Sequence, residues 1–93
     1  MTTYHARVLD AETGGEGRYT FEGPADLFKE TPARIVRAFM DHVFTDILPT
    51  EKNDWELNAA LKNAEREVVT AMGAFHFANR APSPFLIMIS AKG

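Results

Sequence analysis

One segment of the chain, from Thr31 to Pro49, reads TPARIVRAFMDHVFTDILP and has a clear helical pattern. Thr31 is a suitable N-cap, and Pro32 suits the first helical position because the N–H of that position has no partner within the helix. Pro49 ends the pattern because proline has no N–H to donate and its ring clashes with the preceding turn. We therefore predict a helix over about residues 31–48. Its apolar residues form one wide face that can cover a small sheet: Ile35, Val36, Phe39, Met40, Val43, Phe44 and Ile47.

The residues before this helix alternate with the period of two that is typical of β-strands. The alternation covers residues 3–9 and 18–22, and the segment between them contains three glycines, Gly14, Gly15 and Gly17. Glycine readily adopts the positive φ angles that reverse a chain. The sequence therefore predicts a β-hairpin with a fairly long loop.

Residues 55–66 fit two structures, and the choice between them sets the number of strands. As a helix they form an apolar stripe, and their Ala, Leu and Glu content favours that structure. As a strand they place Trp55 on the apolar side, whereas a helix would turn Trp55 directly away from the stripe. We therefore expect a strand here, and two further strands at residues 68–77 and 85–91.

The predicted fold is a single α+β domain over residues 1–93, with the order β-β-α-β-β-β. It is a mostly antiparallel five-stranded sheet with the long helix packed on one face. In the alternative, residues 54–66 form a second helix and the sheet has four strands.

The chain's composition bounds the kind of partner that we expect. Its 93 residues contain no cysteine, which excludes a disulfide scaffold and thiolate metal sites and favours a reducing compartment. The amino-terminal residues lack the pattern of a signal peptide, and the longest apolar run, Phe85 to Ile89, is too short to span a membrane. We expect a cytoplasmic protein that binds no membrane. The formal charge of −3 argues against nucleic acid as a partner, because such proteins usually carry a positive excess.

A search for catalytic patterns finds neither a phosphate-binding loop nor a nucleophile motif nor a metal-binding helix. The histidines His5, His42 and His76 are not spaced as a local metal pair, so we expect no metal and no cofactor. His42 and Asp46 are four residues apart on the predicted helix and should touch, which suits a general base but is also a common surface contact. They are the candidate catalytic residues, and the sequence favours a protein without a catalytic centre over an enzyme.

The predicted sheet has more apolar residues than one helix can cover. When the more apolar side of each strand faces the helix, Ala59 and Leu61 lie in the core, and Ala60 and Lys62 lie on the opposite side. That opposite side still carries large apolar residues, and a contiguous apolar patch with a polar rim is typical of an interface or a ligand groove. The residues that we assign to this interaction face are Leu9, Met72, Leu86, Met88 and His76.

Three interpretations of this face remain open. The first is a protein-interaction module, most simply a homodimer, since two-fold dimers are the commonest oligomers. The second is a small-molecule-binding domain or small enzyme that uses the same sheet face. In the third, a loop such as residues 49–54 or 78–84 folds over the patch. We rank the interaction module first because few polar groups in the sequence would converge on a ligand.

Overall fold

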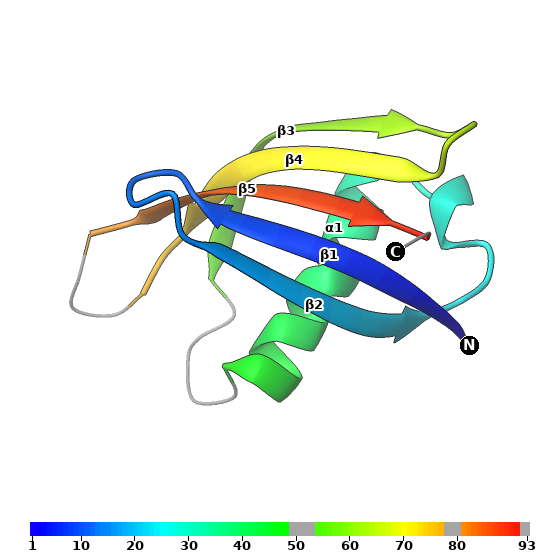
Figure 1. Ribbon diagram of the computed structural model, residues 1–93, viewed down its shortest axis with the longest axis horizontal. Helices are drawn as coiled ribbons and strands as arrows, with labels where there is room; N and C mark the ends of the chain where they lie inside the picture. Colours follow the sequence, from blue (N-terminus) through cyan, green and yellow to red (C-terminus); the bar gives the residue numbers. More distant parts are fainter. Residues whose placement is uncertain (49–53, 78–80, 92–93) are drawn as a thin grey trace.

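The computed structural model describes residues 1–48, 54–77 and 81–91. Five strands form one antiparallel sheet with the order β2-β1-β5-β4-β3, and a helix crosses one side of it (Figure 1). The predicted α+β fold with the order β-β-α-β-β-β is confirmed. The strands are β1 (Thr2–Asp10), β2 (Glu16–Gly23), β3 (Trp55–Asn63), β4 (Val68–Phe75) and β5 (Ser83–Ser90).

The last strand of the chain, β5, occupies the centre of the sheet. It pairs with β1 on one side and with β4 on the other, so it joins the hairpin β1–β2 to the hairpin β3–β4. A central strand has neighbours along both edges and can be apolar on both faces. The run from Phe85 to Ile89 has this character and lies inside β5.

The helix α1 (Pro32–His42) begins as the sequence predicts. The Thr31 hydroxyl accepts a hydrogen bond from the Arg34 N–H at 3.4 Å, and Pro32 occupies the first helical position. The chain continues from α1 into one π-helical turn, η2 (Val43–Ile47), so the helical segment as a whole matches the predicted span of about 31–48. A short 3₁₀ helix, η1 (Leu27–Lys29), precedes it.

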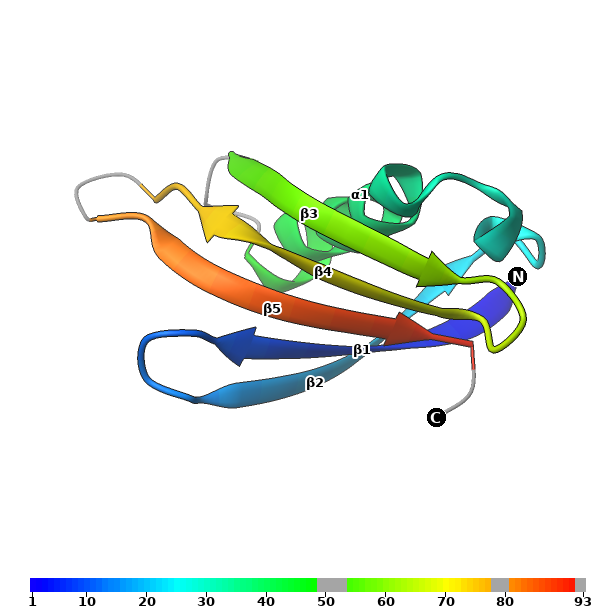
Figure 2. The ribbon, with the colours of Figure 1, turned by 90° about the horizontal axis from the view of Figure 1, so that it is seen from above.

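The hydrophobic core lies between α1 and the sheet, and Figure 2 shows the helix on one side of the sheet only. Aromatic side chains provide much of its contact. Phe21 packs against Phe39 and Tyr4 with ring centroids 5.5 and 5.6 Å apart, and Phe75 packs against Phe85 at 4.7 Å. The hydroxyl of Tyr4 donates to the Pro24 carbonyl, which gives its polar end a partner at the edge of the core.

The loop of the hairpin β1–β2 is held by Asp10. Its carboxylate accepts hydrogen bonds from the N–H groups of Glu12 at 2.9 Å and Thr13 at 3.3 Å. Gly14 follows with φ of +76°, the left-handed conformation that glycine adopts at little cost. The predicted turn is confirmed for Gly14 and Gly15, whereas Gly17 belongs to β2, which begins two residues earlier than the predicted strand.

The ambiguous segment after residue 54 is strand β3, so the alternative with a second helix is wrong. The prediction of which residues face the helix is wrong for part of this strand, because the register with β4 shifts between Leu57 and Ala59. This β-bulge adds one residue and exchanges the two faces beyond it. Ala60 therefore packs against the core, and Leu61 is 77% exposed.

Lys62 also lies on the opposite side from the predicted one. Its ammonium group donates to the carbonyl oxygens of Phe28 at 3.1 Å and Glu30 at 2.8 Å, which lie in η1 and at its carboxyl end. The same shift in register that turns Leu61 outward thus turns Lys62 toward the helical side of the sheet.

Candidate interaction face

We call the side of the sheet opposite α1 the open face, and the strand pairing arranges its side chains in rows across the strands. Two adjacent rows cross all five strands, in the direction from β3 to β2. The first row is Ala59, Met72, Leu86, Leu9 and Glu16, and the second row is Leu61, Thr70, Met88, Arg7 and Arg18.

The half of these rows over β3, β4 and β5 is almost entirely apolar. We call its four largest members, Leu61, Met72, Leu86 and Met88, the apolar patch. Their exposed fractions are 77%, 48%, 38% and 45%, and among the described residues Met1 is the one other large hydrophobic residue with comparable exposure. A monomeric surface seldom gathers its exposed apolar residues on one face in this way.

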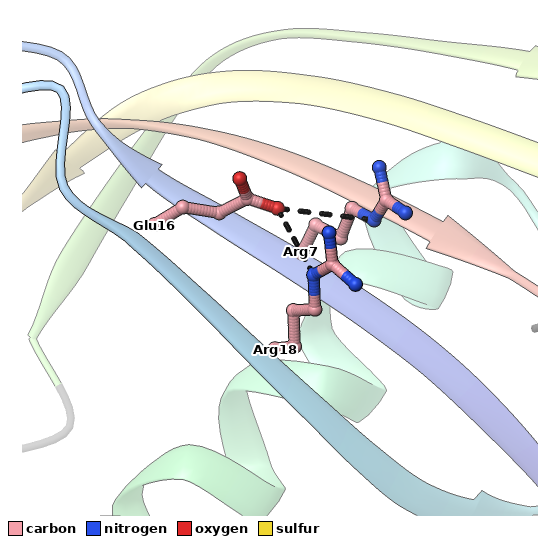
Figure 3. Close-up of polar contacts among 3 residues, drawn as sticks. All are labelled: Arg7, Glu16 and Arg18. Atoms are coloured by element: carbon pink, nitrogen blue, oxygen red, sulfur yellow. Dashed lines mark hydrogen bonds and ion pairs between the residues drawn. The ribbon is translucent and has the colours of Figure 1, made fainter.

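The half of the rows over β1 and β2 is charged. One oxygen of Glu16, Oε1, lies 3.9 Å from Arg7 Nε and 3.4 Å from Arg18 Nε (Figure 3). All three side chains are well exposed. Since one carboxylate is shared by two guanidinium groups, this cluster carries an excess positive charge next to the apolar patch.

The predicted members of the face do not all lie in the apolar patch. Met72, Leu86 and Met88 lie side by side in it, and Leu9 is half-buried between Leu86 and Glu16. His76 follows the end of β4, where its Nε2 lies 3.0 Å from Glu56 Oε1 and its backbone N–H donates to the Asp54 carbonyl. His76 is therefore at the border of the open face, engaged with β3.

Sequence reasoning placed Arg7 on this face but missed two of its features. Leu61 was assigned to the core because the bulge in β3 leaves no clear mark in the sequence. The charged cluster was missed because Glu16 was assigned to the hairpin loop, whereas β2 begins at Glu16. The observed register pairs Leu9 with Glu16 and Arg7 with Arg18, which brings the three charged side chains together.

The candidate catalytic pair lies elsewhere, on the helical side of the sheet. His42 Nδ1 is 2.9 Å from Asp46 Oδ2, as the four-residue spacing predicts, and the His42 ring stacks on Phe21 at 6.2 Å. The pair borders a shallow groove of about 440 Å³. The predicted contact between His42 and Asp46 is therefore present. In the described part of the chain, no serine, threonine or tyrosine hydroxyl is hydrogen-bonded to His42.

A larger groove of about 830 Å³ runs between α1 and β3. Its walls mix charges, with Arg34 and Arg37 beside Asp41 and Asp54. Arg34 is already paired with Glu30 at 3.7 Å. Because acidic and basic side chains line the groove together, its charge favours neither an anionic nor a cationic ligand.

Residues 1–48, 54–77 and 81–91 were compared with the requirements of a metal-binding cluster and of a membrane-spanning helix, and they meet neither. Groups of three or more acidic or histidine side chains arranged to hold a metal ion are absent from this part of the chain. None of its helices has the length and hydrophobicity that crossing a bilayer requires.

Comparisons of the chain with protein-family models, with curated proteins and with solved structures found no match. The open face is therefore the feature of the molecule from which we infer a function.

Proposed function

We propose that this protein is a small interaction module that forms a homodimer through the open face of its sheet. The observation that supports this proposal most is the apolar patch, which lies on three neighbouring strands including the central one. Removal of such an exposed apolar surface from water by a second surface is favourable, because of the hydrophobic effect. Two of its four members are methionines, whose flexible side chains adapt to a facing surface.

The size of the open face suits a dimer. Strands of eight or nine residues that rise about 3.3 Å per residue, set about 4.8 Å apart, give five strands a flat footprint of about 600–700 Å². The accessible area exceeds this footprint because the side chains project from it. A stable interface buries about 800 Å² on each partner, so most of the face would take part.

The composition of the patch favours a protein surface over a small ligand. Small-molecule sites place a few polar groups where they converge on the ligand. On β3, β4 and β5, the two rows that hold the patch contain Thr70 as their single polar side chain. A flat apolar surface with a charged rim resembles the anatomy of a protein interface.

Sedimentation equilibrium tests this proposal with one substitution and one control. We expect the wild-type protein to be dimeric at micromolar concentration and Met88→Glu to be a folded monomer, because the substitution replaces an apolar patch member on the central strand with a charge. Ala33→Glu introduces the same charge at an exposed position of α1 and should leave the dimer intact.

A strictly monomeric wild-type protein at high concentration would contradict the proposal. Circular dichroism of Met88→Glu separates a lost interface from a lost fold, and because Met88 is 45% exposed we expect the fold to persist.

A further inference from the structure

We infer that the two copies of the proposed dimer are related by a two-fold axis that runs across the strands, so that Arg18 of each copy meets the partner's Glu16. This inference rests on the proposed function and adds to it the arrangement of the partner. It follows from the register of the sheet and from the distribution of charge on the open face.

Symmetry and sheet packing leave few arrangements. A two-fold dimer uses the same surface on both copies, so when two open faces meet, the axis lies in the plane between them. Packed sheets most often keep their strand directions within about 30° of each other. The axis therefore runs either nearly along the strands or nearly across them.

An axis along the central strand turns β1 and β2 of one copy over β4 and β3 of the other. Arg7 then faces the partner's Thr70, and Arg18 faces the partner's Leu61. This arrangement covers two guanidinium groups, which share the one carboxylate of Glu16, with a surface that offers no second carboxylate, and an excess charge is costly to remove from water. The distribution of charge disfavours it.

An axis across the strands, between the two rows, lays each strand over its own counterpart and exchanges the rows. Leu86 then faces the partner's Met88, and Leu61 faces the partner's Ala59, so the apolar halves cover each other. On β1, Arg7 faces the partner's Leu9 and keeps Glu16 of its own copy as its charge partner. At the β2 edge, Arg18 faces the partner's Glu16, and the symmetry forms this contact twice.

The atoms of Glu16 and Arg18 are arranged for such a contact. Both arginines approach Glu16 through its Oε1 atom, and no described residue donates a hydrogen bond to its Oε2. Arg18 uses only Nε in this contact, which leaves its two terminal nitrogens to donate (Figure 3). A guanidinium and a carboxylate that meet across an interface form a charge-assisted pair, which fixes the orientation of the partners.

Charge reversal tests this pairing. Arg18→Glu should weaken the homodimer about tenfold or more, because each interface contact then joins two carboxylates, and Glu16→Arg should do the same with two guanidinium groups. Mixed in equal amounts, the two variants should form a heterodimer of near wild-type affinity, since both contacts again join opposite charges. Fluorescence-labelled chains and sedimentation velocity measure all three affinities.

Matched controls remove the effect of net charge. Arg37→Glu on α1 and Glu65→Arg in the turn after β3 change the charge by the same amounts at exposed positions. We expect each control variant to dimerise as the wild type does, and their mixture to gain no affinity over either homodimer.

The possible failures are distinguishable. If Met88→Glu abolishes the dimer but the two charge-reversed variants do not weaken it, or weaken it without recovery on mixing, the across-strand axis is wrong and the proposed function stands. If the wild-type protein is monomeric, both are wrong.

Discussion

Gly73 shows how strongly one residue can be constrained by the bulge in β3. A Cβ atom at this position would lie 2.0 Å from the backbone oxygen of Glu56 and 2.9 Å from Phe85 Cζ. The first of these neighbours is backbone and cannot rotate away. Any side chain at this position would therefore push β3 away from β4 where the bulge forms.

We predict that Gly73→Ala destabilises the protein by roughly 2–4 kcal/mol, because overpacking of this kind costs about 1–3 kcal/mol and sometimes more. Gly15→Ala is the control, since its Cβ would meet only the Thr13 hydroxyl oxygen at 3.3 Å in an exposed loop. Urea unfolding monitored by circular dichroism measures both. Equal midpoints for the two variants would show that the close approach at Gly73 is not as described.

The bulge also explains why sequence reasoning assigned Leu61 to the wrong face. Alternation places every second residue of a strand on one side, and an added residue reverses the pattern from that point on. Asn58 lies where the register shifts, yet nothing about an exposed asparagine in a strand distinguishes a bulge from regular pairing. The side chain with the greatest exposure in the patch was therefore the one that the sequence could not place.

Among the elements, α1 was the most predictable because its start depends on local chemistry, the Thr31 cap and Pro32. The hairpin β1–β2 was predictable for the same reason, since its turn is built from nearby residues. Two other features could not be predicted. They are the π-helical turn after α1 and the contact of Lys62 with η1 and Glu30. The Lys62 contact joins residues more than thirty positions apart.

The contact between Lys62 and the Phe28 and Glu30 carbonyls joins the edge strand β3 to the segment that leads into α1. We predict that Lys62→Met destabilises the protein by about 1–2 kcal/mol, because hydrogen bonds from a charged donor are each worth about 1.5–3 kcal/mol and this group is only partly buried. Lys29→Met, at an exposed position of η1, should change stability by less than about 0.5 kcal/mol.

Thermal unfolding of both lysine variants provides the comparison. A Lys62→Met variant as stable as Lys29→Met would mean that the contact with the two carbonyls contributes nothing to the attachment of β3.

At the scale of the whole molecule, the sheet has one face covered by α1 and one face that carries the apolar patch. Sequence reasoning predicted this division and three of the four patch members, Met72, Leu86 and Met88, because a central strand that is apolar on both sides needs two covers. It could not predict how the charges of Arg7, Glu16 and Arg18 are arranged beside the patch, because that depends on strand register. The proposed dimer and its axis depend on both features.

The four methionines of the chain test directly whether the protein dimerises through its open face, because their methyl groups lie in different parts of the molecule. Met72 and Met88 lie in the apolar patch, Met40 is a fully buried residue of α1, and Met1 is at the exposed amino terminus. In a protein labelled with ¹³C at the methionine methyl groups, we predict that dilution from a concentration at which the protein sediments as a dimer to one at which it sediments as a monomer shifts the Met72 and Met88 signals, while Met40 and Met1 stay unchanged. Four methyl signals that are all independent of concentration, in a protein that sediments as a monomer throughout, would contradict self-association through the open face.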